Sequence, residues 1–431
     1  MKIYTLIVLL FFSIQGWSLE FSLIKKESRI SEPTLLIIGG IQGDEPGGFN
    51  AASILSTRYS IQSGNVWIVP NLNFYSIIKR SRGPYGDMNR KFASLKKSDP
   101  EYEIVQRIKA IITDDQVDLI LNLHDGSGFY RPEYIDNKHS PFRWGQCCII
   151  DQEFIDSPQY GNLKEIADFV SNRVNESLLK EEHRFHVHNT RTREGDKEME
   201  KTLTYYAINS GKPAFGNEGS KEFGTEFRVY YHLLAVEAYM DYMGIEYERH
   251  FPLTPKAIKS VINDDYHVTL FEKITLPTQG IRKKLNYIPT DKKKTIFSSE
   301  NPLICAVKEG KNYKIHYGNR KVALLSPQFF HYDDSLSSMS IEVDGKEEEI
   351  EPGMTISVEN YFKVLDKEGY RVNVIGFSNS KKLETGVAIS EKKIPKRFSV
   401  DKKGKIFRVE IYKDKKFSGM FLVKFEQKSR A

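Results

Sequence analysis

Gln42 and Glu45 stand three positions apart in a glycine-rich segment that follows a short apolar run. The run covers residues 34–38 and ends in Gly39 and Gly40. A glutamine carbonyl oxygen and a glutamate carboxylate can both ligate a divalent metal ion. A helical turn at this point would place the two side chains on one face. A capped helix start also explains the spacing, so the pair alone indicates a metal site only weakly.

A second polar group ends another apolar run. His124 and Asp125 follow residues 117–123, and Gly126 comes next. In open α/β sheets, ligands bind at the carboxyl ends of the strands. A lone histidine is usually structural, but a histidine at this position is expected to be a metal ligand.

Glu218 follows a third short run, residues 213–217. A carboxylate at a strand end can act as a general base that takes a proton from an activated water. The structural alternative for this segment is a helix N-cap region. Trp144 stands beside Arg143 in a polar stretch, where it either forms a wall of the pocket or packs structurally.

Arginine and asparagine side chains gather in the segment RSRGPYGDMNRKF, which contains Arg80, Arg82, Asn89 and Arg90. A guanidinium group binds a carboxylate through two parallel hydrogen bonds, and an asparagine adds directed ones. The segment is therefore a candidate for holding a substrate carboxylate. A surface loop rich in arginine is the alternative.

The elements that must position these residues alternate between strands and helices in the first 245 residues. Continuous apolar runs predict buried strands, and apolar spacing near 3.6 residues predicts helices. Strands alternating with helices imply an α/β domain with a parallel or mixed sheet. The predicted strands cover residues 34–38, 66–69, 117–123 and 213–217, and the predicted helices cover 101–112, 163–174 and 226–243.

After about residue 250, short alternating runs separated by turn signals replace the helical pattern, which predicts β-rich domains. The predicted strands lie at 313–317, 339–343, 355–358, 371–375, 407–411 and 421–425. We expect a signal peptide at 1–18, a catalytic domain at 19–248, a small β-rich domain at 249–334 and a β-sandwich-like domain at 335–431. This organisation suits a chain of 431 residues.

The N-terminus predicts export. Lys2 is followed by an apolar run over residues 3–12, and the small residues Gly16 and Ser18 are spaced as a signal peptidase requires. The run is too short to span a bilayer. A buried N-terminal element is the alternative. The three cysteines, Cys147, Cys148 and Cys305, form no disulfide framework and are expected to be buried free thiols.

The charge is mildly basic, with 63 basic and 57 acidic residues and a net charge of +6. Such a balance suits an anionic partner, for example cell wall or a membrane surface, and does not require nucleic acid. A lysine-rich solvated surface explains it equally well.

Together, the four polar groups resemble the zinc carboxypeptidase family, which includes desuccinylases and deacylases. That family has His-x-x-Glu, an Asn-Arg pair, a strand-end histidine and a catalytic glutamate, in this order along the chain. The resemblance covers roughly residues 30–245 and implies one zinc ion per chain. The family pattern implies the following residues and roles: Gln42, Glu45 and His124 as ligands, Glu218 as base, Arg82 for the oxyanion, and Asn89 and Arg90 for the terminal carboxylate.

Gln42 departs from the family, which has histidine at this position. An amide oxygen is a weaker ligand than imidazole. The substitution and the β-rich second half resemble the peptidoglycan carboxypeptidases that set cell shape in helical Gram-negative bacteria. That subgroup implies a periplasmic enzyme that trims tripeptide stems of muropeptides to dipeptides and releases meso-diaminopimelate.

Three alternatives remain open from the sequence. The first is an inactive carboxypeptidase-like domain that binds wall peptides. The second is a scaffold whose β-rich half binds protein partners, and the third is a deacylase of small substrates. His186 and His188 alternate as on a strand, which indicates either a second metal site or, as we expect, solvent-facing histidines. No motif selects Tyr205 or Tyr206 as a substrate contact.

Overall fold

The computed structural model describes residues 19–29, 33–291, 296–379 and 384–426. The chain divides into two compact units, Met1–Asn263 and Asp264–Ala431. The predicted signal peptide lies outside the described residues. Within the described ranges, no helix is long and apolar enough to cross a membrane.

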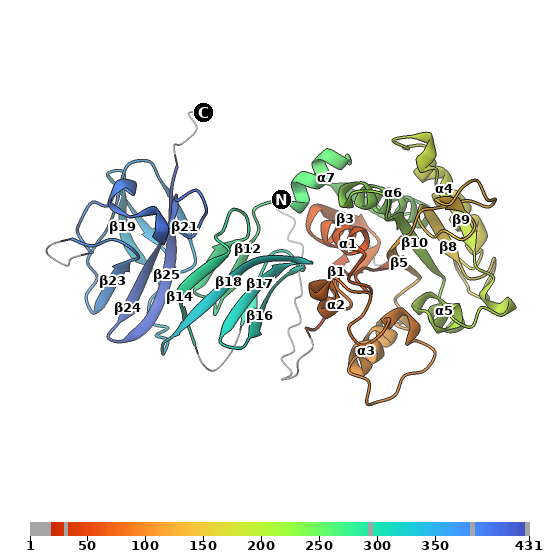
Figure 1. The fold of residues 1–431 in the computed structure, drawn as a ribbon, viewed down its shortest axis with the longest axis horizontal. Coiled ribbons are helices and arrows are strands. Elements are labelled where there is room, and N and C mark those ends of the chain that lie inside the picture. Colours follow the sequence, from red (N-terminus) through yellow and green to blue (C-terminus); the bar gives the residue numbers. More distant parts are fainter. Residues whose placement is uncertain (1–18, 30–32, 292–295, 380–383, 427–431) are drawn as a thin grey trace. The chain divides into compact units, whose positions relative to one another are not determined.

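The first unit is built on a seven-stranded mixed sheet (Figure 1). Its order is β1 (Ile24–Glu27), β4 (Asn65–Val69), β2 (Thr34–Ile38), β5 (Leu119–Gly126), β10 (Ala214–Ser220), β8 (Cys147–Ile150) and β9 (His186–Asn189). The strands β4, β2, β5 and β10 are parallel, whereas β1 and β8 are antiparallel to their neighbours β4 and β10. All four strands predicted for this half are present. They are buried along their whole length, which explains why they are continuous apolar runs rather than alternating ones.

Helices cover both faces of this sheet. Figure 1 shows α1 (Pro46–Arg58), α4 (Leu163–Asn175) and α6 (Thr225–Met243) on one side and α3 (Tyr102–Ile112) and α5 (Leu203–Asn209) on the other. The predicted helices correspond to α3, α4 and α6. Helix α6 packs against α1, α4 and β10 and is therefore buried on most of its surface. It does not show the single polar face of an amphipathic surface helix. The α/β class is confirmed.

Short elements complete this unit. They are α2 (Phe74–Lys79), α7 (Pro255–Ile262), the pair β3 (Tyr59–Ser63) and β11 (Glu246–Arg249), the pair β6 (Phe129–Tyr130) and β7 (His139–Ser140), and 3-10 turns at Met88–Arg90, Glu181–His183, Thr192–Glu194 and Met199–Lys201.

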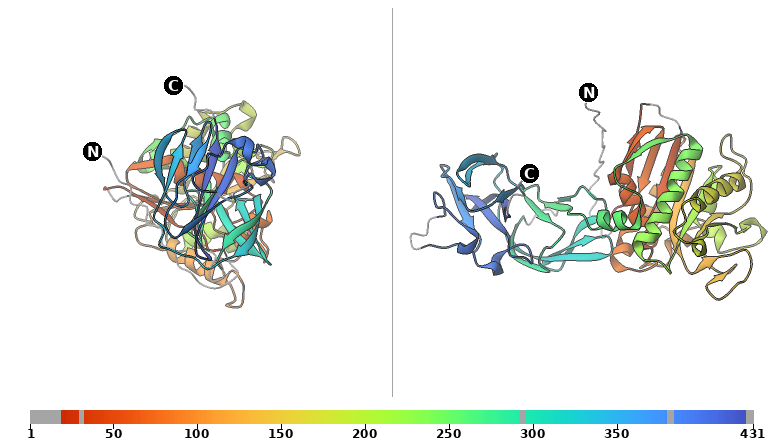
Figure 2. Two further views of the ribbon diagram at one scale, coloured as in Figure 1. Left: turned by 90° about the vertical axis from the view of Figure 1, so that its left-hand side faces the viewer. Right: turned by 90° about the horizontal axis from the view of Figure 1, so that it is seen from above.

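The described residues of the second unit are rich in strands, as predicted, and include two short 3-10 turns (Figure 2). One of its sheets has the strand order β13 (Ile274–Pro277), β12 (His267–Leu270) and β15 (Phe297–Ser298). A second has the order β14 (Lys284–Thr290), β18 (Arg320–Phe329), β17 (Asn312–Tyr317) and β16 (Ile304–Glu309). A third sheet has the order β20 (Lys346–Ile350), β19 (Met339–Val343) and β22 (Phe362–Val364). A fourth has the order β21 (Thr355–Val358), β25 (Lys416–Phe425), β24 (Ile406–Lys413) and β23 (Tyr370–Val374). The inward-facing residues of these last two sheets share one apolar core.

The register of the central strands sets the position of the site. Ile38 of β2 lies opposite Asn122 of β5, and His124 of β5 lies opposite Glu218 of β10. Because the three strands are parallel, their carboxyl ends meet at one edge of the sheet. The side chains that follow these ends therefore converge.

Candidate active site

Gln42 and Glu45 lie in the turn between β2 and α1. The expected helical turn is absent: α1 begins at Pro46, and Glu45 is its N-cap residue. The turn is tightly packed, because a Cβ added at Gly43 would lie 2.0 Å from the backbone of Ser76. Glycine is required at this close approach. The turn brings both side chains to the end of β5, although not by the helical geometry that the spacing suggested.

The side chains of Gln42, Glu45 and His124 converge. His124 Nδ1 lies 2.9 Å from Glu45 Oε2 and 3.2 Å from Gln42 Oε1. All three side chains are buried, with exposed fractions of 1%, 4% and 6%. A tetrahedral zinc ion with bonds near 2.0–2.1 Å separates its ligand atoms by about 3.3 Å. The His124–Gln42 distance of 3.2 Å is close to that value, and the His124–Glu45 distance of 2.9 Å is shorter, as in a hydrogen bond.

This donor set fits a metal ion. It combines one imidazole nitrogen, one carboxylate and one amide oxygen, and all three are groups that divalent metals accept. Among the described residues, no three His, Cys, Asp or Glu side chains form a metal-binding group. The glutamine oxygen lies 3.2 Å from His124 Nδ1, where it could serve as a third donor beside the imidazole and the carboxylate.

Asp87 orients the Gln42 amide. Gln42 Nε2 donates to Asp87 Oδ1 at 2.7 Å, so its carbonyl oxygen is turned towards His124. Asp87 also accepts from Arg82 Nε at 2.8 Å and from the backbone N–H of Asn89 at 2.9 Å. Burial raises the pKa of Asp87, but the hydrogen bond from Gln42 and the charge of Arg82 outweigh it, and the pKa is lowered overall. The carboxylate is therefore ionised and acts only as an acceptor. Sequence reasoning missed this residue, although it lies two positions before Asn89.

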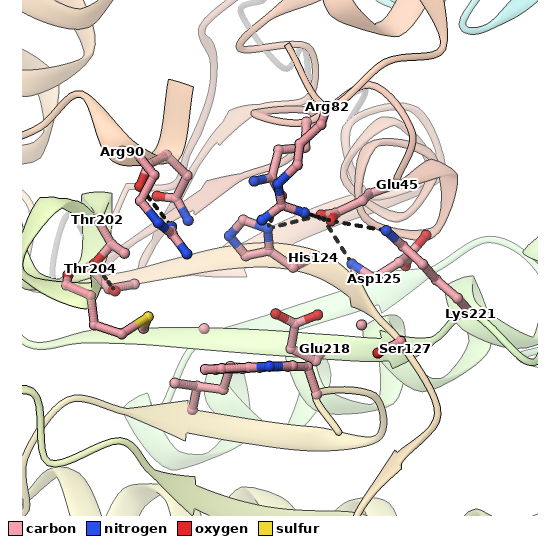
Figure 3. Close-up of a pocket in the computed structure, with 17 residues that line it drawn as sticks. Glu45, Arg82, Arg90, His124, Asp125, Ser127, Thr202, Thr204, Glu218 and Lys221 are labelled. Carbon is pink, nitrogen blue, oxygen red and sulfur yellow. Dashed lines mark hydrogen bonds and ion pairs between the residues drawn. The ribbon is translucent and has the colours of Figure 1, made fainter. Parts of the chain in front are cut away.

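Glu218 projects from β10 towards His124 and Glu45 (Figure 3). Its exposed fraction is 8%, and its Oε2 has no hydrogen-bond partner among the described residues. Burial, together with the negative charges of Glu45 and Asp125, raises its pKa well above the usual value. A carboxyl group in this state has high proton affinity, which suits a general base close to neutral pH.

Asp125 joins β5 to helices α1 and α6. It accepts from the Gly47 backbone N–H at 2.8 Å, from Arg228 at 3.1 Å and from His232 Nε2 at 3.1 Å. Burial alone would raise its pKa, but the hydrogen bond and charge of His232 and the charge of Arg228 lower it. The Asp125 backbone N–H in turn donates to Glu45 Oε2 at 3.2 Å. This network holds Glu45 in place beside His124.

Arg90 lies on one side of the cavity, next to Thr202 and Thr204 (Figure 3), and Asn89 also lines the cavity. The Asn89 amide oxygen accepts from the Leu203 backbone N–H at 2.9 Å, so the amide N–H groups are what Asn89 can offer to a ligand. Arg90 Nη1 donates to the Asn89 backbone carbonyl at 3.0 Å, and Arg90 Nε lies 3.7 Å from Oε2 of the exposed Glu198. Its guanidinium group retains free donors for a carboxylate.

Arg82 and Lys221 line the cavity on other sides of the converging groups. Arg82 lies 3.6 Å from Glu45 Oε1, and Lys221 lies 3.4 Å from the same atom and 3.3 Å from Asp44. The cavity has a volume of about 390 Å³, and Trp144 forms part of its wall. Arg80 ends α2 and is not among the residues that line it. The cavity thus brings together all eight residues singled out for this site.

His186 and His188 lie on one face of β9, as their alternation predicted, but they are not solvent-facing. His188 stacks on Tyr130 with ring centroids 4.0 Å apart and lies 4.9 Å from Trp144. Burial lowers the pKa of His188 to about 4. The strand is at the sheet edge, but the loop that carries Tyr130 and Trp144 covers this face, which the sequence did not reveal. The cysteines are buried free thiols, as predicted.

A mixed sheet with parallel central strands, three converging donors at the strand ends, a buried glutamate and an Asn–Arg pair is the arrangement expected of a metallocarboxypeptidase. Comparison with known families agrees. The family described as the catalytic domain of carboxypeptidases controlling helical cell shape matches residues 1–263, and the C-terminal domain of metallo-carboxypeptidases matches residues 332–426. The chain belongs to this carboxypeptidase family.

Solved structures give the same result. The chain is similar to the cell shape determinant Csd4 of Helicobacter pylori in its tripeptide-bound form, with 40% identity, a TM-score of 0.89, and coverage of 94% of this chain and 100% of that one. The mDAP-bound form of Csd4, described as a D,L-carboxypeptidase, is 41% identical with the same TM-score and coverage. The apo form is 40% identical with a TM-score of 0.88. A comparison with curated proteins finds no match. The expected family, fold and enzyme class are confirmed.

Proposed function

We propose that this carboxypeptidase is zinc-dependent and acts in the periplasm, where it trims the tripeptide stems of peptidoglycan to dipeptides and releases meso-diaminopimelate. The observation that supports this most directly is the arrangement of the cavity. It places an Asn–Arg pair on one side and a buried glutamate beside a convergent donor set in the centre. The similarity to Csd4, whose structures hold a tripeptide and mDAP, supports the substrate class.

Gln42, Glu45 and His124 would hold the zinc ion. Bound there, zinc supplies a Lewis acid for the scissile carbonyl and lowers the pKa of water. Glu218 accepts the proton of the attacking water and delivers it to the leaving amine. Its raised pKa and its position in β10 opposite His124 support this role. Arg82 donates to the oxygen on which negative charge develops.

Asn89 and Arg90 would bind the terminal carboxylate of the departing residue, which makes the reaction exopeptidic. In a tripeptide stem, this carboxylate belongs to diaminopimelate. In a tetrapeptide, the next alanine converts it to an amide, and a charge-assisted interaction worth roughly 1.5–3 kcal/mol is lost. That loss corresponds to about 10- to 150-fold discrimination in favour of the tripeptide.

Digestion of purified muropeptides followed by mass analysis tests this function. The wild type should convert tripeptide to dipeptide and free diaminopimelate and leave tetrapeptide and pentapeptide intact. Glu218→Gln is the matched control because it keeps the shape of the side chain without its base. Release of terminal D-alanine from the longer stems would refute the substrate assignment while leaving the carboxypeptidase class in place.

The alternative is a non-catalytic protein that binds wall peptides, motivated by the weaker ligand Gln42. Such a protein would retain tripeptide but release no diaminopimelate even with saturating zinc. Glu218 argues against it, because a buried carboxylate with an unpartnered oxygen is costly unless the site uses it. Protein partners of the second unit are a further prediction, which pull-down with the full chain tests.

A further inference from the structure

Exposed cations gather on one part of the second unit. Residues 391–405 and the start of β14 contribute them, and we call this set the cationic patch. Its members are Lys283, Lys284, Lys392, Lys393, Lys396, Arg397, Lys402 and Lys403, all of them exposed. The two segments are adjacent, because Ile281 forms a bridge with Asp401 and the Arg282 backbone N–H donates to the Val400 carbonyl at 2.9 Å.

The backbone beneath the patch is fixed by several hydrogen bonds. The Arg282 guanidinium group donates to the carbonyl of Ser399 at 2.9 Å and to that of Lys396 at 2.8 Å. The Asp401 carboxylate accepts from the backbone N–H groups of Lys403 at 3.0 Å and Lys405 at 2.8 Å. The cations therefore project from a folded surface with a defined spacing.

The positive charge of the patch is not neutralised within the described part of the chain. Residues 391–405 include two acidic side chains, Glu391 and Asp401. Glu391 pairs with Lys405 at 2.6 Å, and Asp401 is buried under its backbone donors. No member of the patch forms an ion pair with a described residue. Like charges gathered on one surface repel one another, so an anionic partner would stabilise the arrangement.

We propose that the cationic patch binds the carboxylate-rich peptide stems of the cell wall, as a second contact separate from the active site. This inference rests on the proposed function, which makes that polymer the substrate. A tripeptide stem carries more carboxylates than ammonium groups, and the dipeptide left after trimming is still anionic. The patch would therefore hold the enzyme on the polymer before and after each cleavage.

The chemistry of the patch favours a hydrated polyanion over a lipid bilayer. Insertion into a bilayer requires apolar side chains beside the cations. Two large rings are exposed near the cations, Phe398 at 37% and Tyr287 at 70%. The Phe398 ring also packs against Gly376, where an added Cβ would lie 2.5 Å away, and Arg397 covers it at 5.0 Å. Charged side chains therefore outnumber exposed apolar ones on these segments.

Two contacts with one polymer raise the effective concentration of stems at the active site. The effect exists only when many stems are linked, so it predicts a difference between substrates. Loss of the patch should slow cleavage of intact sacculi but leave cleavage of the soluble tripeptide unchanged. A damaged active site would slow both.

The test uses the full chain and purified sacculi, with binding measured by co-sedimentation and turnover by released diaminopimelate. Lys402→Glu/Lys403→Glu and Lys283→Glu/Lys284→Glu each reverse two charges, one pair on each segment of the patch. Either variant should weaken binding to sacculi about 5- to 30-fold at low salt. The matched control is Lys415→Glu/Lys416→Glu, because these exposed lysines lie at the opposite end of β24, roughly 24 Å away at about 3.4 Å per residue.

Unchanged binding of both patch variants would overturn the proposal. An equal loss in the control would overturn it as well, because net charge rather than the patch would then explain the effect. Tight binding of the wild type to anionic vesicles but not to sacculi would assign the patch to lipid instead. Turnover of soluble tripeptide separates the two proposals: if the wild type fails there, the proposed function is wrong, whereas sacculus binding still reports on the patch.

Discussion

Replacing Asp87 should separate metal binding from catalysis in this site. The Asp87 carboxylate accepts from the Gln42 amide through Oδ1 at 2.7 Å and from Arg82 through Oδ2 at 2.8 Å. In Asp87→Ala, the amide of Gln42 loses the acceptor that turns its oxygen towards His124. A hydrogen bond to a charged group contributes about 1.5–3 kcal/mol, so zinc affinity should fall by about 10- to 150-fold. This agrees with the roughly 10- to 100-fold effects known for groups that orient metal ligands.

Asp87→Asn gives a different result and serves as the matched variant. Its amide oxygen should occupy the place of Oδ1, because the two donors there are Gln42 Nε2 and the Asn89 backbone N–H. The amide nitrogen of the new asparagine then faces Arg82 Nε, and because both groups are hydrogen-bond donors, the hydrogen bond to Arg82 is lost. Zinc affinity should fall by less than in Asp87→Ala, while kcat should drop because Arg82 is displaced. Competition with a chelator measures the affinity, and tripeptide turnover at saturating zinc measures kcat.

Unchanged zinc affinity would refute the proposed role of Asp87 in orienting Gln42. If Asp87→Ala binds zinc within about twofold of the wild type, a change below ~0.5 kcal/mol, then Asp87 does not orient the ligand. Thermal melting serves as the control for folding, because Asp87 also caps the turn Met88–Arg90. Loss of that cap costs about 1 kcal/mol, which is too little to unfold the domain. If Gln42→His restores zinc affinity when it is added to Asp87→Ala, the defect of Asp87→Ala lies in the orientation of the Gln42 amide.

Four further predictions follow from the site. Glu218→Gln should keep its zinc and lose at least ~10²-fold in rate; loss of metal together with activity would make Glu218 a ligand. Arg90→Ala should lower kcat/KM for tripeptide about 10- to 150-fold with zinc retained, and a variant as fast as wild type would exclude the carboxylate clamp. A chelator should abolish turnover and zinc should restore it, as elemental analysis and mass analysis of products will show. Burial lowers the pKa of His188 to about 4 from 6.5, so the unfolded chain binds this proton more readily than the folded chain. The free energy of unfolding should be unaffected by this group above pH 6.5 and should fall by on the order of 3 kcal/mol as the pH drops towards 4. Calorimetry of His188→Phe should find a smaller fall over the same pH range.

Several features of this protein could be read directly from the sequence. The buried strands β2, β4, β5 and β10 are short apolar runs with polar residues at their ends, a pattern set by burial on both faces of a sheet. Parallel strands place their carboxyl ends at one edge, so Gln42, Glu45, His124 and Glu218 could be assigned to one site from their strand-end positions together with the resemblance to the family's motif order. The β-rich second half was visible from its period of two and its turn residues.

The local geometry of the metal-binding turn was not predicted. A spacing of three suggested a helical turn for Gln42 and Glu45, whereas the chain passes through a tight turn that ends at the N-cap of α1. The close approach of Gly43 to the backbone of Ser76 forces this path. A contact between segments 33 residues apart in the chain has no signature in local spacing.

The groups that orient the site were decided by the tertiary structure. Asp87 contacts Gln42 across 45 positions, and Asp125 contacts His232 across 107. The same holds for His188, which the sequence suggested was exposed but which is covered by Tyr130 and Trp144. Residue type and period report on burial and secondary structure, because these depend on neighbours along the chain. The pKa of a buried carboxyl group and the direction of an amide oxygen depend on partners that only the packed chain brings within hydrogen-bonding distance.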